Sequence, residues 1–395
     1  MYRCLILFAC LVVTCASAQE LRFSIPVEGV LGRDVVVVNH VDHDTASGRF
    51  RDHTCGIQTY DGHDGTDFVL RSFRQMDSGV FVVAAAPGRV IAVVDSLYDR
   101  NKVSIKERGF GNYVAIQHDE GYISYYAHIR KNSAIVTVGS AVTRNQRIAL
   151  VGSSGNSSDP HVHFEVWRRI DPFAGLCADN ISHWNEQPAY NTSYRLLDHG
   201  LTTWPPLLDT IRERPPKALR ITRNDSTVTF WSLQQGIQPT DELVAEWYAP
   251  DNTLWFRYST EAGIASEYYY WWTFINRPSI PGIYHVRFSV NGVERARDSV
   301  DVEAVTSVAD AQPSAADAHP SIANEHPSVA LNIVVRNNVL RVTAGTPARI
   351  TLFDVNGRLL ESHDNVTSMQ LPRMFVVVRV QVGDRTASFV HSRIE

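Results

Sequence analysis

The sequence predicts an all-β fold: an antiparallel β-sheet domain first, then an Ig-like β-sandwich and a small C-terminal β-sandwich. Up to about residue 170, short β-branched runs such as YVAIQH, AIVTV and RIALVG are separated by Gly, Asn and Asp residues, as strands are by turns. From residue 205 onward, runs of alternating apolar and polar residues are divided by the turn signals PDN, PG and NG. No segment has the long amphipathic pattern of a helix, which supports the all-β class.

The chain begins with the pattern of a secretion signal. Arg3 precedes the apolar run from Leu5 to Val13, and Ala16-Ser17-Ala18 forms a small-residue cleavage site. The apolar run is too short to anchor the protein in a bilayer. We therefore predict a signal peptide over residues 1–18 and an exported mature protein without a transmembrane segment.

Composition narrows the class of protein and predicts one covalent bond. The formal net charge of −5 over 395 residues indicates neither a nucleic-acid-binding protein nor a basic membrane-binding surface. Three of the five cysteines lie in the signal, which leaves Cys55 and Cys177 in an oxidising compartment. We predict that these two form a disulfide. Metal ligation is the alternative, but it is disfavoured because the two cysteines lack C-x-x-C spacing.

We expect the first domain to cover residues 19–200, with its core at 58–168, and the Ig-like sandwich to cover 205–303. The second segment contains the aromatic run Tyr268 to Trp272. Aromatic faces can stack on sugar rings, so the run could bind a sugar. A simpler explanation is a sandwich strand whose aromatic residues alternate between the core and the outer face. The run could also mark a contact between domains.

The C-terminal part divides into a linker and a last β domain. Residues 304–330 carry a proline every seven residues, which excludes a coiled coil and predicts an extended linker. Residues 331–395 are again rich in β-branched runs, with Asn356-Gly357 as a hairpin signal.

A glycine-rich stretch, QTYDGHDGTDF, places His63 and Asp67 four residues apart. In an extended strand these residues would lie about 13 Å apart, whereas Gly62 and Gly65 allow the backbone to curl and bring them together. A solvated turn explains the Asp and Gly residues but not the histidine. A metal site explains all of them if further ligands lie elsewhere in the chain.

Candidate partners lie in the stretch SSGNSSDPHVHFEVW, where His161 and His163 open an alternating strand. Residues two apart in a strand share a face and lie about 7 Å apart, so one imidazole could bind a metal while its neighbour handles protons. A His-Asp-His set gives zinc three ligands and leaves a fourth position for water, as in catalytic zinc sites. His128, in SYYAHIRK, is a second candidate for proton transfer.

The order H-x-G-x-D, Y-x-H and H-x-H resembles the lysostaphin/LytM-type zinc endopeptidases, which cleave cross-links in bacterial peptidoglycan. The likeness runs from Tyr60 to Trp167 and includes four blocks in the family's order: APGRVIAVV, GFGNYVAIQHDEGYISYYAH, IVTVGSAV and IALVGSSGNSSDPHVHFE. The resemblance implies one Zn²⁺ per chain, with His63, Asp67 and His163 as its ligands.

The same resemblance implies a LytM-type antiparallel β-sheet with the site in a groove across it. It assigns His128 and His161 the catalytic role of orienting water and stabilising the oxyanion. Val162 stands where the family usually has leucine, and Asn145 replaces a frequent glycine. Neither departure removes an active-site residue. Some LytM-like domains have lost their ligands and act as scaffolds or amidase activators, so the complete set here favours catalysis.

Four further residues near these motifs have candidate roles. Glu165 shares a strand face with His163 and could orient it, and Tyr60 and Tyr126 could line the cleft. His118 recurs in the family outside the ligand set, so we expect it to be structural.

The C-terminal segment is similar to the sorting domains of the type IX secretion system of Bacteroidetes. Asp354, Gly357 and Arg358 form the D-x-x-G-R centre of the stretch ARITLFDVNGRLLE. The usual proline-glycine-tyrosine lead into the penultimate strand is replaced by the stretch from Pro372 to Phe375. The resemblance implies passage through the type IX machinery and cleavage of the tail.

Together, these features predict a secreted zinc metalloendopeptidase acting on peptidoglycan cross-links or glycine-rich peptides. The alternatives are a non-catalytic cell-wall-binding protein or amidase activator, and a surface protease acting on host proteins. The expected location is secreted or attached to the outer surface of a Gram-negative bacterium, or periplasmic if the C-terminal resemblance is wrong. No nucleic-acid partner is expected.

Overall fold

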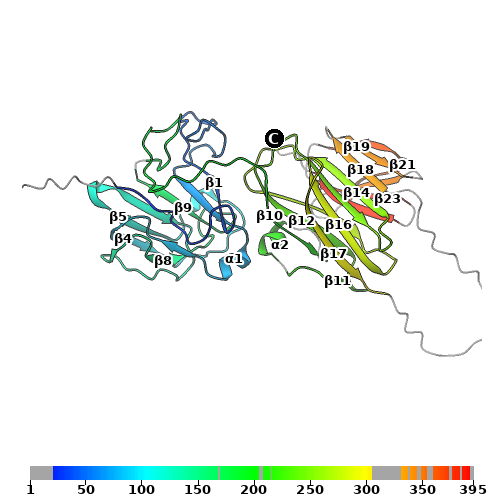
Figure 1. Ribbon diagram of the computed structural model, residues 1–395, viewed down its shortest axis with the longest axis horizontal. Helices are drawn as coiled ribbons and strands as arrows, with labels where there is room; N and C mark the ends of the chain where they lie inside the picture. Colours follow the sequence, from blue (N-terminus) through cyan, green and yellow to red (C-terminus); the bar gives the residue numbers. More distant parts are fainter. Residues whose placement is uncertain are drawn as a thin grey trace, which may run out of the picture.

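Strands make up nearly all the regular structure of the chain, which confirms the predicted all-β class (Figure 1). Helices are limited, in the described part of the chain, to α1 (Phe73–Asp77), α2 (Leu208–Glu213) and two 3-10 turns. None of the helices found there is long and apolar enough to cross a membrane. The computed structural model describes residues 21–167, 170–203, 208–214, 216–304, 331–336, 339–344, 348–353, 359–372, 376–382 and 385–391.

The first unit is built on an antiparallel seven-stranded sheet in the order β1-β2-β9-β6-β5-β4-β7. A separate ribbon of β3 (Phe81–Val83) and β8 (Arg147–Leu150) packs with it. The strands of the large sheet are β1 (Val35–Asn39), β2 (Thr66–Leu70), β9 (His161–Val166), β6 (Ile123–Ala127), β5 (Tyr113–Gln117), β4 (Gly88–Val94) and β7 (Ala141–Val142).

Alternation along two central strands separates the core from the face that carries the polar site. On β9, Val162, Phe164 and Val166 are fully buried in the hydrophobic core. On β2, Phe68 and Leu70 join the same core. Since successive side chains in a strand point to opposite faces, the intervening residues of both strands, including the two histidines of β9, lie on the other side of the sheet.

The predicted disulfide between Cys55 and Cys177 is confirmed. It joins the loop that precedes β2 to the irregular segment that follows β9, and the two loops lie side by side above the sheet (Figure 1). Asp52 organises the first loop, because its carboxylate accepts hydrogen bonds from the backbone of Thr54, Gly56 and Gln58. Loop, disulfide and sheet therefore form one connected frame around the polar face.

The second unit consists of two sheets that share one hydrophobic core. The first sheet contains β10 (Arg195–Thr202), β12 (Thr227–Gln235), β15 (Tyr269–Asn276), β24 (Arg385–His391), β23 (Val376–Val382), β20 (Ala348–Phe353) and β21 (Leu359–Val366). The second contains β11 (Arg220–Ile221), β17 (Val293–Val302), β16 (Gly282–Val290), β13 (Glu242–Tyr248), β14 (Leu254–Glu261), β18 (Leu331–Arg336), β19 (Val339–Thr343) and β22 (Ser368–Gln370).

This arrangement differs from the expected division into separate sandwiches over 205–303 and 331–395. Strand β18 pairs in parallel with β14, and β24 pairs with β15, so both sheets continue into the C-terminal segment. This pairing covers the open edges of β14 and β15. Ile333 of β18 and Val378 of β23 lie in the common core. Strand β10 also belongs to this unit, although the first domain was expected to extend to residue 200.

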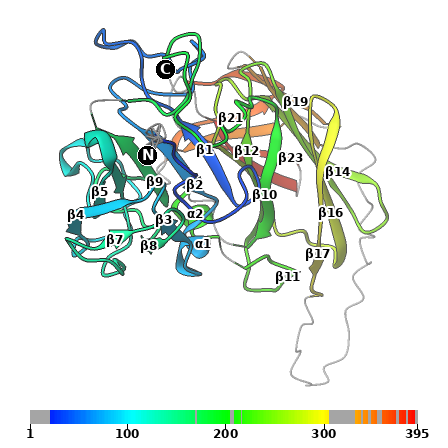
Figure 2. The ribbon, with the colours of Figure 1, turned by 60° about the vertical axis from the view of Figure 1, so that its left-hand side comes forward.

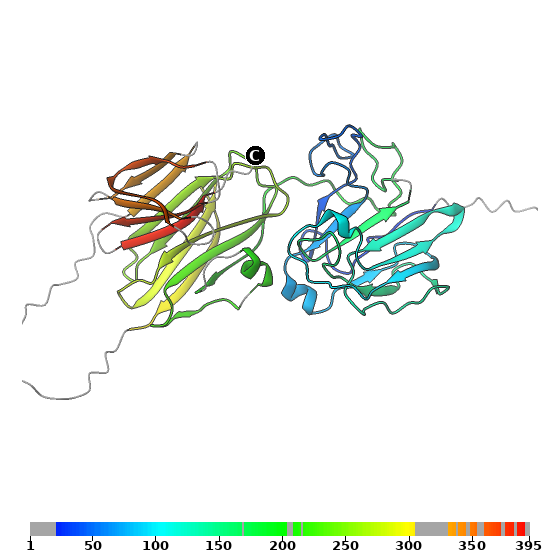
Figure 3. The same ribbon diagram turned by 180° about the vertical axis from the view of Figure 1, so that it is seen from behind.

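The two units lie side by side and meet at β1 and β10 (Figures 2 and 3). Val36 of β1 packs against Leu197 and Leu233 of the second unit. In the aromatic run, the Tyr268 hydroxyl donates to the Leu70 carbonyl at 2.7 Å, while Trp271 lies in the core of the second unit. The run therefore serves packing and the contact between units, in agreement with the simpler interpretation.

Several sequence predictions concern residues outside the described part of the chain. They are the signal peptide at 1–18, nearly all of the linker at 304–330, and the D-x-x-G-R centre with its Asp354, Gly357 and Arg358.

Candidate metal centre and active site

The glycine-rich turn brings His63 and Asp67 together, as the sequence predicted. Gly62 has a φ of +78°, a left-handed conformation that glycine adopts without strain. Gly65 has a different function: a Cβ built on it would lie 2.7 Å from the His163 ring and 2.6 Å from the Phe164 carbonyl. The turn therefore needs one glycine for its curvature and another for its close approach to β9.

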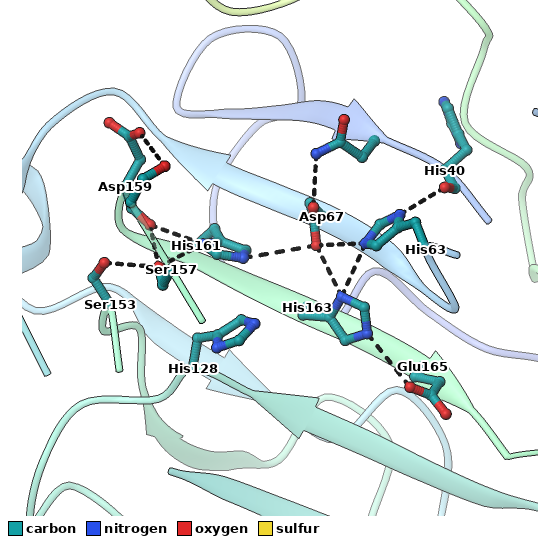
Figure 4. Close-up of polar contacts among 12 residues, drawn as sticks. His40, His63, Asp67, His128, Ser153, Ser157, Asp159, His161, His163 and Glu165 are labelled. Carbon is teal, nitrogen blue, oxygen red and sulfur yellow. Dashed lines mark hydrogen bonds and ion pairs between the residues drawn. The ribbon is translucent and has the colours of Figure 1, made fainter. Parts of the chain in front are cut away.

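Three buried side chains converge around one point in front of the sheet (Figure 4). The distances are 3.2 Å from His63 Nε2 to Asp67 Oδ1, 3.0 Å from His163 Nδ1 to Asp67 Oδ1, and 3.1 Å between the two ring nitrogens. Ligand atoms about 2.0–2.1 Å from a tetrahedral zinc ion lie about 3.3 Å apart. The two nitrogens and one oxygen thus fit a zinc site with little adjustment.

Each of the three residues is held at the atom that faces away from this point (Figure 4). His63 Nδ1 donates to the His40 carbonyl at 2.7 Å, which leaves Nε2 with the lone pair when the ring is neutral. The Asp67 Oδ2 atom accepts from the Asn39 amide at 2.8 Å. His163 Nε2 lies 3.5 Å from Glu165 Oε2, so Glu165 occupies the orienting position predicted for it.

His128 and His161 lie beside this group, with ring centroids 4.5 Å apart. His128 Nδ1 donates to the Ser154 carbonyl at 2.7 Å, and His161 Nδ1 donates to the Asp159 carbonyl at 2.8 Å. Both neutral rings therefore keep an unprotonated Nε2. His161 Nε2 lies 3.7 Å from Asp67 Oδ1, so the proposed proton-transfer group borders the candidate ligand set.

The backbone of His128 is in an unusual conformation, with a φ of +62°. Its amide donates to the Phe110 carbonyl at 3.0 Å. Left-handed conformations of residues other than glycine carry strain and are enriched at functional sites. Here the conformation ends β6 and turns the imidazole toward the other histidines.

Burial and charge act differently on the titratable groups of this site. Burial lowers the pKa of His128 well below its ordinary value, and it lowers that of His161, so both rings are neutral at pH 7. For Asp67, burial opposes ionisation, but His63 and His161 outweigh it and hold the pKa well below its ordinary value. For His163, burial is outweighed by Asp67 and Glu165, which raise its pKa to about 9.

The two tyrosines predicted to line the cleft have different positions. Tyr60 is 46% exposed and its ring lies beside His63, tilted, with ring centroids 4.5 Å apart, so it does border the site. The prediction for Tyr126 is wrong: it is fully buried, and its hydroxyl accepts from the Ala85 amide. Tyr126 pairs across strands with Phe164 and therefore shares the core face.

Two further aromatic residues near the site were missed from the sequence. Phe110 lies 5.7 Å from His163 between ring centroids, and Tyr125 packs 5.4 Å from Phe110. Knowing that Tyr126 is in the core would have placed Tyr125 on the opposite face by alternation alone. His118, as expected, is structural, bonded to the Pro87 carbonyl and the Ser124 hydroxyl.

The remaining contacts could not be read from residue types. Asn39 lies outside the motifs, and the carbonyls of His40, Ser154 and Asp159 act through the backbone, which any residue supplies. Their contribution depends on strand pairing and loop conformation.

Part of the chain that carries this site resembles known peptidoglycan-related proteins. Residues 61–174 match the family model described as Peptidase family M23. The chain is 35% identical over 117 residues to the peptidoglycan DD-endopeptidase ShyB of Vibrio cholerae, covering 30% of this chain and 23% of that protein. It is 41% identical over 91 residues to the murein hydrolase activator EnvC of Escherichia coli K12, covering 23% of this chain and 19% of that protein.

A solved structure of a zinc containing peptidase from Vibrio cholerae is 27% identical, with a TM-score of 0.26 and coverage of 37% of each chain. The present chain spans no more than about a quarter of the length of the two curated relatives. For the segment 61–174, the expected resemblance to the lysostaphin/LytM-type peptidases of family M23 is confirmed.

Proposed function

We propose that this chain is a zinc metalloendopeptidase that hydrolyses peptide bonds in peptidoglycan cross-links or glycine-rich peptides. The observation that carries the proposal is the triangle of His63 Nε2, Asp67 Oδ1 and His163 Nδ1, with sides of 3.0–3.2 Å. Two neutral imidazoles border this triangle. The candidate metal ligands and the candidate proton-transfer groups thus lie in one buried site.

His63, Asp67 and His163 would hold the ion, and their two nitrogens and one oxygen are ligand types that zinc accepts. Three protein ligands leave one position for water or substrate, as in catalytic zinc sites. When bound, zinc lowers the pKa of a coordinated water toward neutrality and polarises the scissile carbonyl.

His128 and His161 supply the proton chemistry. Each ring is held by a carbonyl at Nδ1 and is neutral at pH 7, so Nε2 can accept a proton from the attacking water. A ring protonated at Nε2 can then donate to the negatively charged carbonyl oxygen or to the departing amine. Because both rings are fixed by the backbone, this transfer requires little reorganisation of the side chains.

Peptidoglycan is the proposed substrate class because all five residues lie in the segment 61–174 that matches the peptidase family, and because the chain resembles the peptidoglycan DD-endopeptidase ShyB over 117 residues. The proposal includes export by the predicted signal peptide and delivery to the cell surface through type IX machinery, as the C-terminal resemblance implies. Fractionation of cells that produce the full chain tests this location, and retention in the cytoplasm would contradict it.

The decisive assay uses purified mature protein, with zinc content and peptide cleavage measured separately. Defined cross-linked muropeptides and glycine-rich peptides are incubated with the wild type and with His163→Ala, and new amino groups are counted. We expect the wild type to hold one zinc ion and release amino groups, and the variant to do neither. Full activity in the variant would refute the assignment.

An amidase activator is the second candidate, because the relatives found include the murein hydrolase activator EnvC. Such a protein would stimulate a separate amidase without cleaving peptides itself. Wild-type protein that holds zinc, releases no amino groups from either substrate and accelerates an added amidase would favour this function. The complete ligand set and the two poised histidines favour catalysis.

A further inference from the structure

The end of β1 contacts the candidate metal site, although it lies outside the segment 61–174 that matches the peptidase family. Strands β1 and β2 pair antiparallel from Val35 opposite Leu70 to Val37 opposite Phe68. The register then shifts, and Asn39 rather than Val38 lies opposite Asp67. Such a bulge inserts one extra residue and redirects the side chain that follows it.

The bulge determines which side chain reaches Asp67. Directly opposed residues in an antiparallel pair project to the same side of the sheet, so Asn39 shares the site face with the carboxylate. In a regular register, Val38 would occupy this position and would present an apolar side chain to a buried charge. The shift thus exchanges a valine for an amide donor.

The resulting hydrogen bond has a specific geometric effect. Asn39 Nδ2 donates to Asp67 Oδ2 at 2.8 Å, while Oδ1 faces His63 and His163 at 3.2 and 3.0 Å. Asp67 is only 5% exposed, so little solvent is available to replace this donor. A hydrogen bond to an ionised carboxylate is stronger than one between neutral groups. It also opposes rotation of the carboxylate away from the two imidazoles.

We propose that Asn39 is a positioning residue that holds the Asp67 carboxylate with Oδ1 directed at the metal. This inference deepens the proposed function, on which it rests, since it concerns the same site. Asn39 would touch neither metal nor substrate. Its effect would appear in the metal affinity and in the coordination geometry of the metal, and both can be measured without substrate.

A purely structural function for Asn39 makes a different prediction. If the amide only secured the end of β1, its removal would loosen the strand as much as any truncation there. Val38→Ala is the matched control, because Val38 is the adjacent half-buried residue of the same bulge. The control should reduce thermal stability while leaving the metal site unchanged.

The experiment compares the wild type, Asn39→Leu, Asn39→Asp and Val38→Ala as full chains. Zinc affinity is measured by competition with a chromophoric chelator, and Co²⁺ absorption reports coordination geometry. We expect zinc binding about 10- to 100-fold weaker in both Asn39 variants, with an altered Co²⁺ spectrum, because a partner of a metal ligand has been lost. Val38→Ala should match the wild type in both measurements. Wild-type zinc affinity and an unchanged Co²⁺ spectrum in the Asn39 variants would overturn the proposal.

Two controls separate a failure of folding, a failure of the proposed function and a failure of the positioning role: a folding measurement and the zinc affinity of the wild type. Circular dichroism of each metal-free variant identifies those that fold, and Asn39→Asp preserves the size of the side chain if Asn39→Leu does not fold. Wild-type protein that binds no zinc would refute the proposed function itself. Wild-type protein that binds zinc no better than the Asn39 variants would refute only the positioning role.

Discussion

Zinc affinity should depend steeply on pH, because a proton on His163 competes with the metal for Nδ1. In the metal-free site, the contacts of His163 with Asp67 and Glu165 outweigh burial and raise its pKa to about 9. Nδ1 is the ring atom that faces Asp67 and His63. At pH 7 the ring is therefore almost entirely protonated, and binding a metal at Nδ1 must release that proton.

The magnitude follows from the pKa. Two pH units separate pH 7 from a pKa of about 9, so the apparent zinc affinity should be about 100-fold lower at pH 7 than at full deprotonation, which corresponds to about 2.7 kcal/mol. Since the raised pKa favours the protonated ring, affinity should increase about tenfold per pH unit between pH 7 and 9 and level off above. His128 and His161 are already neutral at pH 7, so they should release no proton.

Calorimetry and competition titration test this reasoning. Titrating metal-free protein with zinc at pH 7 in two buffers of different ionisation enthalpy should give a release of close to one proton. Glu165→Gln removes one of the groups that raise the pKa of His163, so its affinity curve should move to lower pH. Affinity that does not change between pH 7 and 9, with no proton release, would refute the assignment of Nδ1 as a ligand atom.

Three further predictions concern the site and its frame. His163→Ala should lose its zinc, measured by atomic absorption, and all peptidase activity; a variant that retains zinc would contradict the ligand assignment. His128→Ala and His161→Ala should retain zinc but lose about 10²- to 10⁴-fold in kcat, measured as amino-group release, and a change in KM alone would contradict a role in proton transfer. Replacing Cys55 and Cys177 by serine should lower the free energy of unfolding by about 2–4 kcal/mol, measured with denaturant, and an unchanged transition would show that the bond adds no stability.

His118→Gln is the matched control for the catalytic histidines. His118 is equally buried but bonds the Pro87 carbonyl and the Ser124 hydroxyl, away from the candidate metal. This variant should lose thermal stability, measured by circular dichroism, while retaining zinc and, below its melting temperature, activity. A loss of zinc would show that histidine substitutions in this sheet act through general unfolding.

The five candidate residues could be predicted from the sequence because their chemistry and spacing are local properties. His161 and His163 lie two residues apart on one strand and therefore share a face. The glycines beside His63 indicate a turn in place of an extended strand. The misassignment of Tyr126, in contrast, has a non-local cause. Neighbouring tyrosines of one strand offer no sign of which is buried until the strand pairs with Phe164 of β9.

The sequence could not show whether residues 331–395 form a separate sandwich or join the preceding sheets. Alternating runs at 331–395 predict strands, but they do not specify a partner, since any open sheet edge can accept them. Pairing with β14 and β15 depends on edges formed some hundred residues earlier in the chain.

By itself, the sequence determined the all-β class, the disulfide pair and the identity of the chemical groups, because periodicity, cysteine count and motif spacing are carried by the order of residues. Tertiary structure decided which atoms those groups present to one another. The bulge that aligns Asn39 with Asp67, and the carbonyls that orient three imidazoles, arise only when distant backbone segments meet. The physical reason is that hydrogen-bond direction depends on register and loop conformation, and neither is written in the type of residue at a single position.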